Sequence, residues 1–399
     1  MKHTSHLRQA KSRLLAISSW VLRNRWLAIM VACMLVGAIV ILTKAATSTI
    51  GIEAEAGTPD GKASVVGNSG ASKQSAIKFS NSTDTTTGWW APPQNTRWQW
   101  VLEGSVDVSQ ASLDRFDMFD IDLTDAVPAP TTQTVTWANG ETRTITWPKG
   151  ANGDAFTALK NAHKKVICYM DTGAFETYEP DATLFPGKWG ANNTSREIAY
   201  NGPAAYANVD VIGGKSEDSA GGTFEGEYWL DIIQGSWQYW APIMWGRLQL
   251  AKSIGCDGIE GDQNNNYGND TTFTTSEAIS LRWYREVYYQ IHSRNMTAIS
   301  KNGIELTSQQ ITEPTNISYC AVGSKMCIPD GILNEECQQY SECDSLNPAT
   351  TKGIWVGQVE YRGTATTICG PANTAKRMTM RKPDNYAVTS TVNFACWEQ

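Results

Sequence analysis

The sequence is poor in the residues that most often carry metal, thiol or phosphate chemistry. It has only four histidines in 399 residues, and two of them, His3 and His6, lie in the N-terminal tail. No His-x-x-x-His or Cys-x-x-Cys pair occurs, so zinc hydrolase chemistry lacks its ligands. Gly-rich phosphate-binding loops are missing as well. Any catalysis therefore depends on carboxylates, and we predict neither a cofactor nor a metal ion.

Acidic residues are missing from residues 1–44, which carry seven Lys and Arg. Subtracting these seven from the 33 basic residues leaves 26 against 40 acidic ones, a net charge of −14 for the remainder. An acidic globular part repels a phosphate backbone, so we expect no nucleic-acid partner. Such a surface suits a cationic or neutral partner instead.

An apolar run over residues 26–42 follows the basic N-terminus directly. It is long for a signal-peptide core and just sufficient for a membrane span. We predict a cytosolic tail over residues 1–25 and a transmembrane or signal-anchor helix over residues 26–43, because basic residues stay on the cytosolic side. A removed signal peptide is the alternative. Both place the rest of the chain outside the cell, on the membrane surface or secreted.

Residues 44–88 are rich in Ser, Thr, Gly and Ala, which is typical of a linker. Within them, residues 52–58 and 71–79 resemble the opening strands of carbohydrate-binding β-sandwich modules. The stretch is too short for such a module, so we interpret it as a remnant or a tether.

Short apolar segments that end in acids recur through residues 89–399. In residues 255–262, Glu260 and Asp262 share one face of a predicted buried strand. The predicted strands are residues 115–122, 165–171, 227–232, 255–262, 296–302, 331–335, 352–361 and 385–392. Helical patterns alternate with them, which indicates an α/β fold, a (β/α)8 TIM-type barrel. The alternative for residues 255–262 is a strand that runs into an Asn-rich turn, with acids that only cap the next helix.

Residues 135–147 alternate polar and apolar side chains around Asn139-Gly140. This pattern predicts a β-hairpin. We expect it to be an insertion that lies over one mouth of the barrel.

Nine cysteines are present, of which Cys33 lies in the apolar run. Cys168 and Cys256 fall inside predicted strands, so we expect buried free thiols. Outside the cytosol, the close pairs among the last six cysteines are sensible disulfides, and one pair is left over. The predicted disulfides are Cys320–Cys327, Cys337–Cys343 and Cys369–Cys396.

Carboxylates stand at the ends of several predicted strands, as Asp171, Asp262 and Glu335 do. Two carboxylates across a polar cleft, one ionised and one protonated, are the minimal set for breaking a glycosidic bond. Glu336 follows Glu335, so a slip of one residue would exchange the acid that points inward. We favour Glu335.

Eight segments resemble, in the same order, those of glycoside hydrolase family 114, the endo-α-1,4-polygalactosaminidases. They are Trp98-Gln99-Trp100, residues 119–123, residues 166–169 with Gly173 and Glu176, Glu227-x-Trp229-Leu230-Asp231, residues 257–262, Lys301-Asn302, residues 334–343 and Val359-Glu360-Tyr361. The resemblance covers residues 89–392.

The resemblance implies an extracellular (β/α)8 barrel that cleaves α-1,4-linked galactosamine polymers by endo action. Asp262 then corresponds to the nucleophile and Glu335 to the general acid/base of a retaining mechanism. The residues expected to line the sugar subsites are Asp122, Asp171, Glu176, Glu260, Lys301, Asn302 and Tyr361. We expect a monomer whose partner is this glycan and which contacts the membrane only through its N-terminal segment.

The sequence also departs from this family near the expected cleft. Family members usually have Ser at the position of Asp171, Pro at that of Gly261, and Asn-Val-Asp at residues 263–265. Two further hypotheses therefore remain. One is a barrel that binds glycan without cutting it, and the other is a hydrolase of a different amino-sugar polymer.

Overall fold

The computed structural model describes residues 63–67, 75–79, 88–189, 198–217 and 223–399. The predicted cytosolic tail and the apolar run lie outside these residues. Within the described part of the chain, no helix is long and apolar enough to cross a membrane. The chain divides into two units, residues 1–84 and 85–399.

The described residues of the first unit form an antiparallel hairpin. It pairs β1 (Ala63–Gly67) with β2 (Ser75–Phe79), and Ala63 lies opposite Phe79. β2 coincides with the second segment predicted to resemble a carbohydrate-binding module. The interpretation of this hairpin as a remnant stays a prediction.

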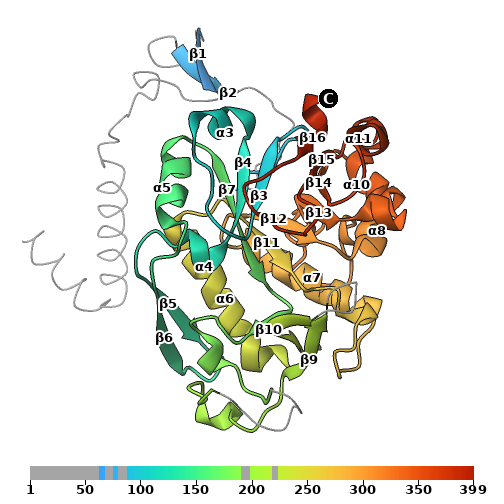
Figure 1. The fold of residues 1–399 in the computed structure, drawn as a ribbon. Coiled ribbons are helices and arrows are strands. Elements are labelled where there is room, and N and C mark those ends of the chain that lie inside the picture. The colour runs from blue at the N-terminus through green and yellow to red at the C-terminus, as the bar shows by residue number, and fades with distance from the viewer. Residues whose placement is uncertain (1–62, 68–74, 80–87, 190–197, 218–222) are drawn as a thin grey trace, which may run out of the picture. The chain divides into compact units, whose positions relative to one another are not determined.

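Eight parallel strands form the centre of the second unit (Figure 1). In sheet order they are β3 (Trp98–Val101), β4 (Met118–Asp122), β7 (Lys165–Asp171), β11 (Gly258–Asp262), β12 (Thr297–Lys301), β13 (Gly331–Glu335), β14 (Trp355–Glu360) and β15 (Met378–Arg381). Short β16 (Phe394–Ala395) pairs antiparallel with β15. The spatial order of the parallel strands follows the chain, as in a TIM-like barrel.

Side chains and loop backbone connect the two outer parallel strands, β3 and β15. The Trp98 indole donates to the Met378 carbonyl at 2.7 Å. The Lys382 amine, just after β15, donates to the Trp100 carbonyl at 2.5 Å and to Gln99 Oε1 at 2.8 Å. These contacts join the first and last parallel strands without a β-ladder between them in the described sheet.

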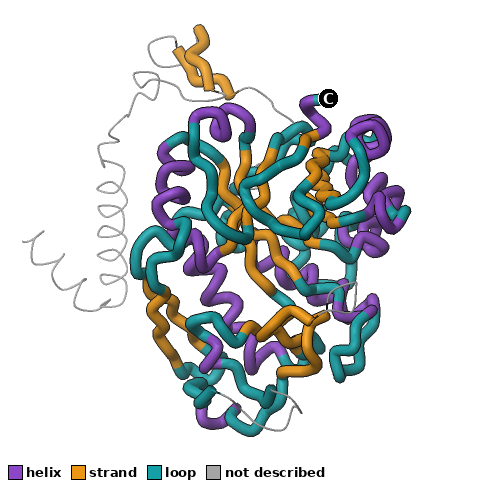
Figure 2. Tube along the Cα trace, in the orientation of Figure 1, coloured by secondary structure: helices purple, strands orange, loops and turns teal. Residues whose placement is uncertain are grey.

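Helices lie outside the parallel strands, as Figures 1 and 2 show. They are α3 (Gln110–Arg115), α4 (Leu123–Ala126), α5 (Gly153–Asn161), α6 (Trp237–Ile254), α7 (Glu277–His292), α8 (Thr307–Gln310), α9 (Cys337–Tyr340), α10 (Asn347–Thr351) and α11 (Ala365–Thr374). α7 buries Trp283, Val287 and Ile291, which recur every four residues on one helix face. The Trp283 ring packs against three tryptophans of α6.

Two predicted barrel strands are wrong. Residues 227–232 overlap β10 (Thr223–Leu230), which pairs antiparallel with β8 (Ala174–Glu176) and β9 (Ile212–Glu217) in a separate sheet. A period of two is the same in either sheet, so the pattern could not reveal the pairing partner. Residues 385–392 form a loop in which Val388 is buried but unpaired as a strand. β3 and β15 take the two places.

The predicted hairpin is confirmed, but its expected position is wrong. β5 (Thr131–Thr136) and β6 (Thr142–Trp147) pair antiparallel beside α6 (Figure 1). The Gln133 amide donates to the Ile243 carbonyl at 3.1 Å, and the Trp137 indole donates to the Tyr239 carbonyl at 3.0 Å. The hairpin therefore packs along α6 and does not cover a mouth of the barrel.

Three predicted disulfides are confirmed, and the prediction of two free thiols is wrong. Cys168 and Cys256 form a fourth disulfide, with their Cα atoms 6.0 Å apart. Cys168 lies on β7, and Cys256 lies two residues before β11. These two strands are neighbours in the sheet. The prediction failed because it treated each strand alone. The confirmed bonds are Cys320–Cys327, Cys337–Cys343 and Cys369–Cys396.

Candidate active site

The expected catalytic residues lie at the carboxyl ends of consecutive parallel strands. Asp171 and Asp262 end β7 and β11 and are partners in the strand register. Lys301 ends β12, and Glu335 ends β13. In a parallel barrel these ends form one face, so the chain brings the four side chains together.

Lys301 connects the two predicted catalytic acids. Its Nζ lies 2.9 Å from Asp262 Oδ2 and 2.9 Å from Glu335 Oε2. Burial alone would lower the pKa of Lys301, but the carboxylates of Asp262 and Glu335 outweigh it and hold this pKa well above its usual value. Lys301 is therefore an ammonium ion at neutral pH, held between the Asp262 and Glu335 side chains.

Two tyrosines complete the contacts of these acids. The Tyr361 hydroxyl donates to Glu335 Oε1 at 2.5 Å. The Tyr169 hydroxyl lies 2.9 Å from Asp171 Oδ1 and 3.2 Å from Asp262 Oδ2. A hydroxyl has one proton to donate, so Asp171 and Asp262 compete for it.

Hydrogen bonds between backbone and side-chain groups hold both predicted catalytic residues in place. The Gln263 N–H donates to Asp262 Oδ1 at 2.7 Å, and Gln263 has a left-handed φ of 59°. Asn302 Oδ1 accepts from the Glu335 N–H at 3.3 Å. The left-handed turn at Gln263 requires a glycine at position 173, because a Cβ there would lie 1.8 Å from the Gln263 carbonyl oxygen. Asn302, expected to contact sugar, thus also positions Glu335.

A model of glycoside-hydrolase family GH114 matches residues 80–397. The chain belongs to family GH114. This membership makes it a glycoside hydrolase and confirms the predicted family.

One solved structure agrees with the fold of this GH114 chain. The chain is similar to Aspergillus fumigatus Ega3 in complex with galactosamine, with a TM-score of 0.52 and 23% identity over 76% of this chain and 97% of that one. Weaker likenesses are to the pneumococcal virulence factor StrH (TM-score 0.38, 8% identity, 74% and 76% covered) and to a morphinone reductase mutant (TM-score 0.39, 10% identity, 75% and 88% covered). No curated protein matches the sequence.

Glu260 lies behind Lys301 in the GH114 barrel and is fully buried. Its Oε2 accepts from the Trp100 indole at 3.0 Å, and its Oε1 lies 3.8 Å from Lys301 Nζ. Asp120 is its buried neighbour, and burial raises the pKa of Asp120 to about 7. Burial and Asp120 also raise the pKa of Glu260 well above its usual range. Asp120 and Glu260 therefore share a proton at neutral pH. They lie next to Lys301 inside the barrel.

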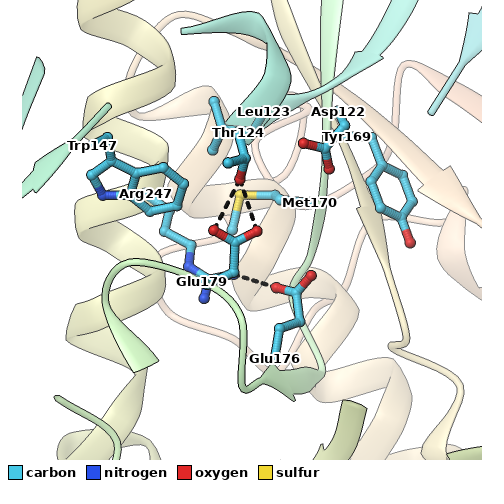
Figure 3. Close-up of a pocket in the computed structure, with 9 residues that line it drawn as sticks. All are labelled: Asp122, Leu123, Thr124, Trp147, Tyr169, Met170, Glu176, Glu179 and Arg247. Atoms are coloured by element: carbon cyan, nitrogen blue, oxygen red, sulfur yellow. Dashed lines mark hydrogen bonds and ion pairs between the residues drawn. The ribbon is translucent and has the colours of Figure 1, made fainter. Parts of the chain in front are cut away.

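A second group of acids lines a pocket beside the GH114 site (Figure 3). Arg247 of α6 donates to Glu176 Oε2 at 2.5 Å and to Asp181 Oδ1 at 2.7 Å. Asp122 accepts from the Asp125 N–H at 3.0 Å and so caps α4, while burial raises the pKa of Asp122 to about 7. Two predicted subsite residues, Asp122 and Glu176, thus lie in this pocket and already have protein partners.

Sequence reasoning missed several residues of the GH114 site. Tyr169 could have been found, since it stands two residues before Asp171 on the same strand face. Glu227 was recognised only as part of a motif. It lies opposite Glu176 across the β8–β10 pair, and burial, with Glu176, raises the pKa of Glu227 to about 7. Its importance follows from the separate sheet, which the sequence pattern did not predict.

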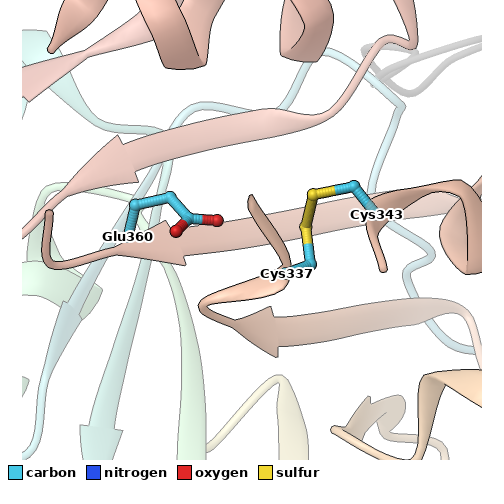
Figure 4. A group of neighbouring side chains, drawn as sticks. All are labelled: Cys337, Cys343 and Glu360. Carbon is cyan, nitrogen blue, oxygen red and sulfur yellow. A yellow bond between two sulfur atoms is a disulfide. The ribbon is translucent and has the colours of Figure 1, made fainter. Parts of the chain in front are cut away.

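One group of possible metal ligands occurs in the described residues, Cys337, Cys343 and Glu360 (Figure 4). The two sulfur atoms are joined in a disulfide, so they offer no thiolate to a metal ion. Glu360 Oε1 accepts from the Gln338 N–H at 2.8 Å and from the Gln358 amide at 2.7 Å. This group is therefore structural.

Proposed function

We propose that this GH114 enzyme is an extracellular, endo-acting hydrolase of α-1,4-linked galactosamine polymers. Asp262 is the nucleophile, and Glu335 is the general acid/base. The observation that supports these roles most is the pair of 2.9 Å contacts that Lys301 makes to both acids at the carboxyl ends of their strands. The galactosamine bound to the similar Ega3 supports the choice of sugar.

The distance between the two acids favours a retaining mechanism. Asp262 Oδ2 and Glu335 Oε2 each lie 2.9 Å from the same nitrogen, so these oxygens are no more than twice that distance apart. Retaining enzymes hold their carboxyl groups roughly 5–5.5 Å apart, whereas inverting enzymes need roughly 6.5–9.5 Å to admit a water molecule.

The reaction then proceeds in two displacements. Asp262 attacks the anomeric carbon, while Glu335 gives its proton to the departing glycosidic oxygen. In the second step Glu335 takes a proton from water, the resulting hydroxyl attacks the anomeric carbon, and the bond to Asp262 breaks. Lys301 and Tyr169 hold Asp262 in position for attack, and Tyr361 does so for Glu335.

Acids around this centre suit a polymer of amino sugars. Asp171 and Glu227 lie near the nucleophile, and burial raises the pKa of each. An ammonium group on the sugar would stabilise their ionised forms through Coulomb attraction. The net charge of −14 after residue 44 favours a polycationic chain in the same way.

Export is supported by the four disulfides, because such bonds persist in oxidising compartments. The membrane anchor over residues 26–43 remains part of the proposal, as does action as a monomer. The domain boundaries given above remain predictions too.

The test is incubation of the full-length protein with a galactosamine polymer, followed by analysis of chain length. We expect short oligosaccharides whose new anomeric protons keep the α configuration by NMR. Asp262→Asn and Glu335→Gln should abolish them, whereas Asp154→Asn, an exposed acid on α5, should not. Binding without shortening would favour a glycan-binding barrel. Cleavage of other amino-sugar polymers alone would reassign the substrate.

A further inference from the structure

The partly exposed ring of Tyr386 is connected to Glu335 through one intermediate residue, Tyr361. Tyr361 is buried and donates its hydroxyl proton to Glu335 Oε1. The ring of Tyr386 packs against that of Tyr361, with centroids 4.6 Å apart and planes at 44°. Tyr386 is 40% exposed. One face of this tyrosine pair thus supports Glu335, while the outer ring reaches solvent beside Arg362, whose guanidinium carbon lies 5.9 Å from the Tyr386 ring centroid.

Glu336 adds an incompletely satisfied acid to the same place. It is only 7% exposed, and its Oε1 has no hydrogen-bond partner in the described structure. Burial raises the pKa of Glu336, and the nearby Tyr386 hydroxyl partly offsets this rise. A buried carboxylate oxygen without a donor is costly, so a ligand that brings a donor to Glu336 would be stabilised there.

The backbone at this place is held in an uncommon conformation. Glu336 has a φ of 61° and Tyr386 a φ of 62°, in the left-handed region that residues with a Cβ seldom adopt. Such conformations persist where the surrounding structure enforces them, and they concentrate at ligand sites. Here they turn Glu336 toward Tyr386 while Glu335 faces Lys301.

We propose that Tyr386 and Glu336 form a subsite for the sugar on the leaving-group side of the cleaved bond, with the ring stacked on Tyr386 and its ammonium group bound by Glu336. The inference rests on the proposed function. Glu335 protonates the departing oxygen, so it lies next to the leaving-group sugar. Tyr386 packs on Tyr361, which contacts Glu335, and this places Tyr386 on the leaving-group side. Aromatic rings stack on apolar sugar faces, and carboxylates bind ammonium ions through charge-assisted hydrogen bonds.

Two substrates distinguish a role in binding the leaving-group sugar from a general role in catalysis. A galactosamine oligomer places a sugar in the subsite, whereas the α-fluoride of the same oligomer leaves as a fluoride ion and places no ring there. With the full-length protein, Tyr386→Ala should lower kcat/KM for the oligomer about tenfold or more, a change that corresponds to about 1.4 kcal/mol. Hydrolysis of the fluoride should stay within about twofold of wild type. Glu336→Gln should behave likewise, and Tyr386→Phe, which keeps the ring, should lose less than Tyr386→Ala.

Tyr319→Ala is the matched control, because the Tyr319 ring packs on Tyr289 of α7 in a similar pair, with centroids 4.5 Å apart at 48°. We expect it to change neither substrate. Equal losses on both substrates, or unchanged oligomer cleavage by Tyr386→Ala and Glu336→Gln, would overturn the subsite while leaving the proposed function intact. A wild-type protein that cleaves neither substrate would instead reject the proposed function. Matched melting temperatures verify that each variant is folded.

Discussion

Two buried cations in this GH114 enzyme each lie between two carboxylates, yet their surroundings differ. Arg247 binds Glu176 and Asp181, and none of the three side chains is more than 6% exposed. Lys301 binds Asp262 and Glu335, but the Glu335 side chain is 27% exposed. The guanidinium occupies both Asp181 oxygens, whereas the ammonium contacts one oxygen of each acid. The enclosed Arg247 group is structural, while the Lys301 group opens to solvent at Glu335, where a substrate can reach it.

The strongest test of this contrast is Arg247→Met. Removing the guanidinium leaves Glu176 and Asp181 buried without a cation, and breaking a buried ion pair costs about 3–5 kcal/mol. We expect the free energy of unfolding to fall by about that amount, as measured by denaturant unfolding. The fraction that remains folded should still cleave polymer.

Lys301→Met should affect catalysis more than stability. It removes the charge that holds Asp262 and Glu335 in place, and loss of one electrostatic group in a site typically lowers kcat about 10²–10³-fold. Partial exposure of Glu335 lets water replace the lost contact, so the change in unfolding free energy should be smaller than for Arg247→Met. If Lys301→Met unfolds the chain as severely and Arg247→Met does not, the contrast is reversed.

A third test uses the acids inside the barrel. The folded pKa of Asp120 is about 7, above its usual 3.8. Between pH 4 and 7 the folded chain therefore holds a proton that the unfolded chain has released, and stability falls as pH rises through this window. A shift of three pKa units at about 1.4 kcal/mol each sets the upper limit of this loss of stability. Because Glu260 shares the proton, we expect Asp120→Asn to reduce the loss by only about 2 kcal/mol. Thermal unfolding of wild type and Asp120→Asn at pH 5 and pH 8 measures this difference. An equal loss of stability between the two pH values in both proteins would contradict the prediction.

The acids at the strand ends could be predicted more reliably than the strands' partners. The positions of Asp262 and Glu335 at the ends of their strands could be predicted, because acids that end apolar segments stand out locally and match a family in order. β15 and β3 were missed as barrel strands, because four residues give too short a pattern. The Cys168–Cys256 bond and the Glu176–Glu227 pair depend on which strands are neighbours, and neither register is encoded within one segment. Arg247 was missed for the same reason, since its partners Glu176 and Asp181 are distant in sequence.

The last test distinguishes the tyrosines of the two regions. Tyr361→Phe removes the hydrogen bond to Glu335 Oε1, and a bond to a charged group is worth roughly 1.5–3 kcal/mol, so kcat should fall about tenfold or more. Tyr178→Phe is the control: its hydroxyl contacts Glu227 Oε1 at 2.9 Å, but the residue is 60% exposed, so water replaces the lost donor and kcat should change little. Steady-state rates on one galactosamine oligomer measure both variants. A larger loss for Tyr178→Phe would mean that the acids near Arg247, and not those near Lys301, act on the bond that is cleaved.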